Sequence, residues 1–228
     1  MSLSERPEDI GYYGNARPEL AARVPVSAMT VLDVGCGVGQ LGRMLKAMVP
    51  GRRVFGIEVV PGVAAEAERV LDRVIVGDVQ TMEPPFPAGS IDCMVFADVL
   101  EHLPDPAAVL RRFTPMLSSS GTVLCSIPNM RHYTSILRLI RRGWIYDDFG
   151  LFDRTHLRFF SRESMHHLLE AAGLTEVTSR PRIIASRKMR LLNFLAAGRL
   201  EEFLAFQYIL LARLEKKKLG LWPSEIGA

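Results

Sequence analysis

The chain has 228 residues, of which 48% are hydrophobic and 23% charged, a composition typical of a folded globular protein and not of a disordered one. This length fits one domain of ordinary size with a sizeable core. A net charge of +3 argues against a nucleic-acid binder, and no basic segment followed by an apolar run opens the chain, so we expect no secretory signal.

Cysteine usage and hydropathy predict a cytoplasmic protein. The three cysteines lie in or beside predicted strands without a C-x-x-C spacing, which is typical of reduced structural thiols. The longest charge-free stretch near the C-terminus, residues 203–212, is too short to cross a bilayer, so no transmembrane helix is expected.

Strand and helix patterns alternate along the chain, which predicts an α/β fold. We expect a Rossmann-like, mostly parallel sheet of seven strands with helices on both faces and an antiparallel closing strand. The predicted strands are 30–34, 53–58, 73–76, 91–97, 121–127, 175–184 and 206–213. Predicted helices include a short one around 17–24, one from Pro106 to about 117 after the Asp105 cap, and one from the Ser161 cap to 172 with Gly173 as a left-handed stop.

The whole chain, 1–228, is expected to form a single domain, with residues 1–27 as a polar lead. Residues 129–160 leave the fifth strand on the side where the strand ends and the glycine loop converge, and we interpret them as an inserted acceptor lid. Residues 185–205 are predicted to form a basic amphipathic helix, and 215–228 a tail.

Residues 31–40, VLDVGCGVGQ, are the most informative about a ligand. An apolar run ends at Asp33 and breaks into Gly35, Gly37 and Gly39 before a helical pattern resumes; this strand, turn and helix start bring backbone close to a nucleotide-like ligand. A dinucleotide fingerprint needs a glycine where Gln40 stands, and Asp33 would repel a pyrophosphate. The ammonium and sulfonium groups of S-adenosylmethionine instead make the carboxylate a partner.

Two further acids end the next two strands. Glu58 ends the second strand, where a carboxylate can accept hydrogen bonds from both ribose hydroxyls, and Asp78 follows the third strand after Gly77, where it can receive the adenine amino group. Acids at three successive strand ends favour S-adenosylmethionine over a dinucleotide.

These motifs resemble those of the class I S-adenosylmethionine-dependent methyltransferases over roughly residues 11–214. Within the class, the segments YYGNARPEL, FADVLEHLPDP and LFDRTHLRFFS are similar to those of bacterial methyltransferases associated with sugar and cell-envelope biosynthesis, and more distantly to ubiquinone-pathway O-methyltransferases. The resemblance implies in-line transfer of a methyl group from S-adenosylmethionine, which leaves as S-adenosylhomocysteine, to a hydroxyl of a saccharide or cell-envelope precursor.

The resemblance also implies which residues hold the cofactor. The glycine loop would contact the methionine part, Glu58 the ribose, and Asp78 with Val79 the adenine, while Asp98 to His102 would line the floor between cofactor and acceptor. Arg17 is placed to pair with the methionine carboxylate or an acceptor phosphate, unless the lead is only a flexible polar segment. The full expected set is Tyr13, Arg17, Asp33, Gly35, Cys36, Gly37, Gly39, Glu58, Val59, Asp78, Val79 and Asp98.

A hydroxyl acceptor has to lose a proton, and a histidine is the obvious base. Among five histidines, His156 in the lid is the first candidate, with Asp153 placed to orient its imidazole, and His102 is the second. A structural role stays open for both, and His132 is a weaker candidate. Glu101 and Asp153 with these two histidines offer metal ligands, but nothing in their spacing requires an ion, so no metal is expected.

Two surface patterns bear on partners. Between 129 and 162 there are seven arginines against three acids, with aromatic residues interleaved, which fits an anionic glycan or a polyprenyl-linked acceptor, or equally an exposed helix with its aromatics turned inward. The basic 185–205 segment can lie on an anionic membrane surface as a peripheral contact, or pack its apolar stripe on the sheet or a second subunit. The oligomeric state stays open.

Other functions are compatible with the same motifs. One is methylation of a small phenolic or quinone-type acceptor, and another is a non-catalytic protein that binds S-adenosylmethionine and regulates a partner. Nucleic-acid methylation is disfavoured, because the fourth strand ends FADVLEH without the Asn/Asp-Pro-Pro-aromatic element that grips a flipped base.

Overall fold

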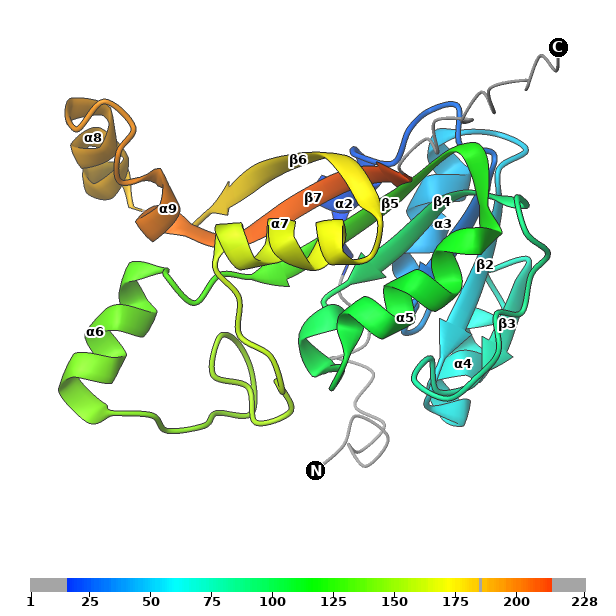
Figure 1. Cartoon of the computed structure of the whole chain (residues 1–228), viewed down its shortest axis with the longest axis horizontal. Coiled ribbons are helices and arrows are strands. Elements are labelled where there is room, and N and C mark those ends of the chain that lie inside the picture. Colours follow the sequence, from blue (N-terminus) through cyan, green and yellow to red (C-terminus); the bar gives the residue numbers. More distant parts are fainter. Residues whose placement is uncertain (1–15, 185, 215–228) are drawn as a thin grey trace, which may run out of the picture.

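The computed structural model describes residues 16–184 and 186–214. These residues form a seven-stranded sheet with the strand order β3-β2-β1-β4-β5-β7-β6 (Figure 1). β7 runs antiparallel to both of its neighbours, and the other pairs are parallel. The strands are β1 (Thr30–Val34), β2 (Arg53–Glu58), β3 (Arg73–Val76), β4 (Ile91–Ala97), β5 (Leu117–Pro128), β6 (Leu174–Ile183) and β7 (Ala205–Leu214). The prediction of a mostly parallel Rossmann-like sheet is confirmed.

Helices cover both faces of the sheet, because alternate residues of its central strands point to opposite sides. Val31 and Val95 pack with α2, α3 and α4, whereas Leu32 and Phe96 pack with α5 and α7. The helices are α2 (Pro18–Ala21), α3 (Gln40–Met48), α4 (Pro61–Ala67), α5 (Pro106–Phe113), α6 (Tyr133–Arg142), α7 (Arg162–Ala171), α8 (Arg187–Leu195) and α9 (Glu201–Leu204), with 3₁₀ turns η2 (Leu100–His102) and η3 (Thr114–Met116).

Several predicted boundaries shift for local reasons. The helix expected over 106–117 ends at Phe113, and the 3₁₀ turn that follows contains Pro115, which lacks the N–H that an α-helix needs. The caps at Ser161 and Asp105 are confirmed, since their side chains accept from Ser164 N and Ala108 N.

The segment 185–205 is not one helix. α8 ends at Leu195, Ala197 and Gly198 take positive φ values of 50° and 80°, and α9 then begins at Glu201. Left-handed backbone ends an α-helix, so the prediction of a continuous helix is wrong. None of the residues of α8 is buried, and its expected packing on the sheet is not seen.

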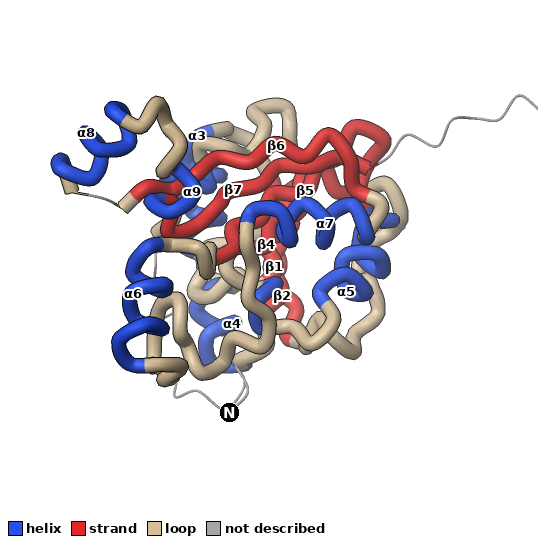
Figure 2. The backbone as a smooth tube through the Cα atoms, turned by 60° about the vertical axis from the view of Figure 1, so that its left-hand side comes forward, coloured by secondary structure: helices blue, strands red, loops and turns tan. Residues whose placement is uncertain are grey.

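Residues 129–160 form an excursion from the sheet between β5 and α7. It comprises α6 and a loop that returns beneath the sheet edge, and in both views α6 and α8 lie at the same end of the molecule (Figures 1 and 2). The segments 1–15 and 215–228, which include most of the predicted polar lead and the predicted tail, lie outside the described residues. Within the described part of the chain, no helix combines the length and apolarity needed to span a bilayer.

Candidate active site

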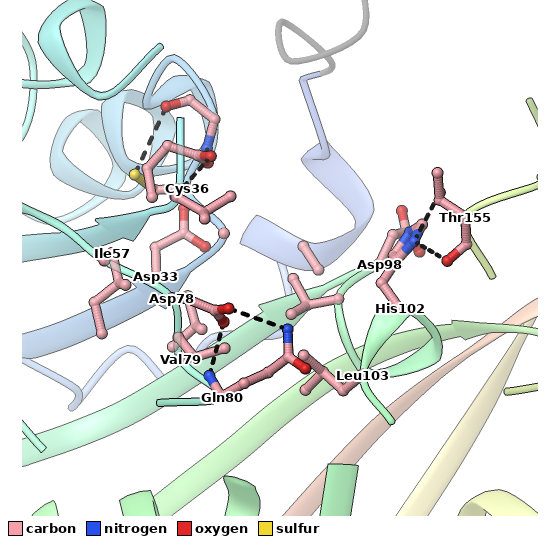
Figure 3. A pocket seen from close by; sticks show the side chains of 18 of the residues that line it. Asp33, Cys36, Ile57, Asp78, Val79, Gln80, Asp98, His102, Leu103 and Thr155 are labelled. Carbon is pink, nitrogen blue, oxygen red and sulfur yellow. Dashed lines mark hydrogen bonds between the residues drawn. The ribbon is translucent and has the colours of Figure 1, made fainter. Parts of the chain in front are cut away.

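A cavity of about 540 Å³ lies where the carboxyl ends of β1, β2 and β4 meet (Figure 3). Open α/β sheets bind ligands at this edge, and the volume is typical of a small-molecule site. Four acids line the cavity: Asp33, Glu58, Asp78 and Asp98. Among the described lining residues, Arg17 is the only lysine or arginine.

The glycine loop takes a conformation that only glycine adopts without cost. Gly35, Gly37 and Gly39 have φ values of 72°, 54° and 79°. A Cβ on Gly35 would lie 2.6 Å from Val99 Cγ2, so a larger residue would also clash. Gly39 does not line the cavity; it precedes α3, and a Cβ there would meet Leu71 of the protein.

Four amides of this loop are already bonded to protein oxygens. Gly35 N and Cys36 N donate to Ile57 O at 2.8 and 3.1 Å, Gly39 N donates to Cys36 O at 2.9 Å, and Gly37 N donates to Glu58 Oε2 at 3.0 Å. A pyrophosphate needs free N–H groups at such a loop. The arrangement therefore disfavours a dinucleotide.

The two inner carboxyls share a buried, acidic environment. Burial, with the nearby Glu58 charge, raises the pKa of Asp33 to about 7. Burial also raises the pKa of Glu58, against the backbone N–H bonds from Gly37, Val59 and Val60, which lower it. A cationic ligand group would favour the ionised form of both.

The outer carboxyls are held by neighbours. Asp78 accepts from Gln80 N at 2.8 Å and Gln80 Nε2 at 3.3 Å. Asp98, at a φ of 56°, is bonded to Arg17, Gln207 and Ser126. Asp98 therefore sits in left-handed backbone that the fold has to hold in place.

Arg17 serves the protein's own carboxylates. Its Nη1 pairs with Asp98, and its Nε pairs with Glu19 at 2.7 Å. These two pairs already neutralise the guanidinium charge. The expected pairing of Arg17 with a cofactor carboxylate is not tested by the structure and stays a prediction. Of the other expected cofactor residues, Cys36, Val59 and Val79 line the cavity, and Tyr13 lies outside the described residues.

His102 is the histidine that lines the cavity. Its Nδ1 lies 3.1 Å from the carbonyl oxygen of Thr155 and 3.0 Å from the Thr155 hydroxyl (Figure 3). The Thr155 hydroxyl donates to Asp153 Oδ1 at 2.8 Å, so both Thr155 oxygens accept from His102. Nδ1 then carries a hydrogen, which fixes the orientation of the ring.

His156 lies behind this wall, not in it. Its ring is edge-on to that of His102, with centroids 4.7 Å apart, and it does not line the cavity. Asp153 accepts from the Thr155 backbone N–H and hydroxyl, so it positions Thr155; its expected role toward the His156 ring stays a prediction. His132 is buried at the start of α6, where burial lowers its pKa, and does not line the cavity.

Glu101 completes this cluster. Its side chain is 1% exposed, and neither carboxylate oxygen has a hydrogen-bond partner. Burial, with Asp98 nearby, raises the pKa of Glu101 well above its ordinary value.

Sequence reasoning missed several lining residues, and Gly56. Gly56 pairs with Asp33 across β1 and β2, and a Cβ on it would lie 2.6 Å from Cys36 Sγ, a contact that no local pattern shows. The other missed residues follow a predicted strand end or flank a candidate histidine, and this position in the sequence could have indicated that they line the cavity. They are Gln40, Leu41, Gln80, Leu103, Pro104, Thr155 and Leu157.

The arginines of 129–162 are less available than their number predicts. Arg131 pairs with Glu202, Arg138 with Asp147, and Arg154 with Asp148. Three of the seven arginines are therefore paired with acids, and the positive surface expected for an anionic acceptor is only partly neutralised.

The charge, the hydrogen bonding and the volume of the cavity fit S-adenosylmethionine. The occupied loop amides and the four acids suit a cationic ligand with an ammonium and a sulfonium, and the volume accommodates a nucleoside. Glu58 and Asp78 stand at neighbouring strand ends, where a ribose and a base would be met in turn.

Residues 7–179 match the family model described as a methyltransferase domain, which is more than half of the chain. The chain belongs to this family, a class I S-adenosylmethionine-dependent methyltransferase fold whose cofactor is S-adenosylmethionine.

Curated relatives match over part of their length. A trans-aconitate 2-methyltransferase from Methylobacterium nodulans is 35% identical over 128 residues, which cover 54% of this chain and 48% of the relative. A ubiquinone biosynthesis O-methyltransferase from Nitrosomonas europaea is 28% identical over 159 residues, 66% of each chain. The chain spans about half the length of the first of these.

Solved structures share the fold. A SAM-dependent methyltransferase from Archaeoglobus fulgidus has a TM-score of 0.64 and 19% identity, with 88% of this chain and 96% of that chain covered. Human N-acetylserotonin methyltransferase in complex with SAM has a TM-score of 0.60 and 17% identity, with 87% and 51% covered.

Proposed function

We propose that this chain transfers a methyl group from S-adenosylmethionine to a hydroxyl acceptor that enters beside residues 129–160. The observation that carries this proposal is the acidic cavity with its occupied loop amides. Asp33, Glu58 and Asp78 would hold the cofactor. When bound, the cofactor supplies a methyl group on a sulfonium and leaves as S-adenosylhomocysteine.

The acceptor side is formed by His102, Thr155 and Leu157. Thr155 fixes the His102 ring, so that Nε2 is the atom that can take a proton. Positioning of acceptor and cofactor alone accounts for roughly 7–11 kcal/mol of the barrier in such reactions, and a base adds about 10²–10⁴-fold. We infer that the acceptor proton leaves toward the cluster of His102, His156 and Glu101.

For the acceptor we propose a saccharide or cell-envelope precursor, with a small phenol or quinone as the second candidate. The name of one matched relative, a ubiquinone biosynthesis O-methyltransferase, supports the second candidate. The acceptor named for the other, trans-aconitate, is a carboxylate and supports neither. Trp144 is exposed, and its ring is held edge-on by Phe152 and Phe159, with centroids 5.2 and 4.7 Å away. The exposed face of this one ring suits a sugar ring or a prenyl tail.

The test is release of S-adenosylhomocysteine with panels of glycans, nucleotide sugars, polyprenyl phosphates and polyprenyl phenols. Turnover on a glycan supports the first acceptor class, and turnover on a phenol supports the second. His156→Ala should keep cofactor affinity and lower turnover at least about tenfold, while the exposed His167→Gln, on α7, serves as the matched control. Tight binding of the cofactor with no turnover on any of the panels contradicts the proposal and favours a regulatory binding protein.

We also propose that the α6–α8 end rests on an anionic membrane surface. α8 exposes Phe194 at 79% and Leu195 at 71%, and α6 exposes Ile140 at 77%. Arg187, Lys188 and Arg190 accompany the apolar residues of α8, and Arg141 and Arg142 end α6, with no acid in either helix. Apolar residues among cations match an anionic lipid interface, whereas a second copy would bring like charges together.

Co-sedimentation tests this contact. We expect binding to vesicles that contain phosphatidylglycerol and weak binding to pure phosphatidylcholine, and loss of binding for the double variant Phe194→Glu, Leu195→Glu. Met48→Glu, an equal change on an exposed residue of α3, is the control. Equal sedimentation of the double variant, or dimerisation through this end, would contradict the membrane contact.

A further inference from the structure

The cluster behind the cavity wall joins residues from two distant parts of the chain. Glu101 and His102 belong to η2, which follows β4, and His156 belongs to the 129–160 excursion. One ligand-type atom from each of the three lies within 4.8 Å of the others, and all three side chains are buried. Two imidazoles and a carboxylate at this spacing are a common ligand set for zinc, iron or manganese.

The carboxylate of Glu101 lacks the partners that a buried charge needs. It is 1% exposed, and both of its oxygens are without a hydrogen bond. Buried polar atoms are almost always satisfied, and a carboxylate in this position is costly unless it is neutralised by a proton or a cation. The cluster therefore has an unmet requirement that a cation would fulfil.

The surroundings of His102 match those of a metal-bound imidazole. Metal-ligating histidines donate their second ring N–H to a carbonyl or carboxylate. Here His102 Nδ1 lies 3.1 Å from the carbonyl oxygen of Thr155, and Thr155 is in turn held by Asp153. Nε2 is then the ring nitrogen that would face an ion, and because His102 lines the cavity an ion has a path to this ring.

We propose that Glu101, His102 and His156 bind one divalent transition-metal ion, which joins the 129–160 excursion to the end of β4. Its role in catalysis rests on the proposed function: a metal at this wall would lower the pKa of an acceptor hydroxyl bound to it. The imidazoles would then be ligands, and this role would replace that of His102 Nε2 as the proton acceptor. The sequence offers these residues as ligands together with Asp153, but no metal was expected from it, because nothing in their spacing requires an ion.

The test measures ion binding directly, without an acceptor. Protein stripped with a chelator is titrated with Zn²⁺, and Co²⁺ is used as a visible-absorption probe. We expect one tight Zn²⁺ per chain, a rise in Tm with Zn²⁺, and a loss of affinity of at least about 100-fold in Glu101→Gln and His156→Gln. Mg²⁺ should not compete, since it prefers oxygen ligands. His167→Gln, on the exposed face of α7, should bind as the unaltered chain does.

Affinity for S-adenosylmethionine reports whether the variants are folded, since neither Glu101 nor His156 lines the cavity. If one variant does not fold, the other still tests the site. Equal Zn²⁺ binding by a folded variant, or no tight Zn²⁺ binding by the unaltered chain, would overturn the proposal and leave Glu101 as a protonated acid. Tight Zn²⁺ binding with no methyl transfer would leave the metal site standing and remove the proposed function. Turnover unaffected by chelation would keep the proposed function and remove the catalytic role of the ion.

Discussion

Asp33 should make the stability of the ligand-free protein depend on pH. Burial raises its pKa from 3.8 to about 7. A group whose pKa is higher in the folded state contributes stability that is complete below its unfolded pKa and lost as the pH rises through its folded pKa. The difference between 3.8 and about 7 corresponds to roughly 4 kcal/mol, lost between about pH 4 and pH 7.

Asp33→Asn isolates this effect, because the amide does not ionise. Urea unfolding of both proteins from pH 4.5 to pH 8 would give the difference in the free energy of unfolding at each pH. We expect the variant to gain on the unaltered chain as the pH rises, and to equal or exceed its stability at pH 8. Two parallel curves would refute the buried, neutral Asp33.

The same carboxyl couples cofactor binding to proton release. A cationic ligand favours the ionised form of Asp33, so binding near pH 6.5 should release a proton, and affinity should rise by up to about tenfold per pH unit below pH 7. Calorimetry in two buffers of different ionisation enthalpy measures that proton. The Asn variant should bind weakly and without proton release; an affinity independent of pH in the unaltered chain would count against the assignment.

Three other substitutions test the frame of the site. Gly56→Ala places a Cβ 2.6 Å from Cys36 Sγ and should destabilise the fold by about 1–3 kcal/mol in urea, with a coupling to Cys36→Ala of at least about 0.5 kcal/mol; strict additivity would show that the two do not meet. Glu58→Gln replaces one carboxylate oxygen by an NH₂ group, so either Gly37 N–H or the N–H groups of Val59 and Val60 lose their acceptor. We expect a loss of about 1–3 kcal/mol in the free energy of unfolding and a weaker affinity for the cofactor. Full cofactor affinity by calorimetry would argue against the role of Glu58. Ser161→Ala removes the cap of α7 and should cost about 1 kcal/mol while leaving cofactor affinity unchanged, so a loss of binding would contradict the separation of α7 from the site.

The alternation of apolar strands with helical patterns was enough to predict the sheet, because each pattern reports which face of an element is buried. The positions of Asp33, Glu58 and Asp78 at one edge of the sheet were predictable from the order of the strands. Parallel strands bring their carboxyl ends to one edge, so residues that follow successive strands meet in space. No long-range contact has to be known for that conclusion.

The tertiary structure decided what local pattern does not carry. Only the folded chain brings His156 to Glu101 and His102, across an excursion whose path depends on packing, and only it shows that Arg17 is paired with Asp98. Side-chain partners are chosen among residues remote in sequence, and their choice depends on geometry set by the whole core. For this protein, the sequence by itself determined the sheet and the acidic edge that selects a cationic ligand, and the fold decided which side chains face the acceptor.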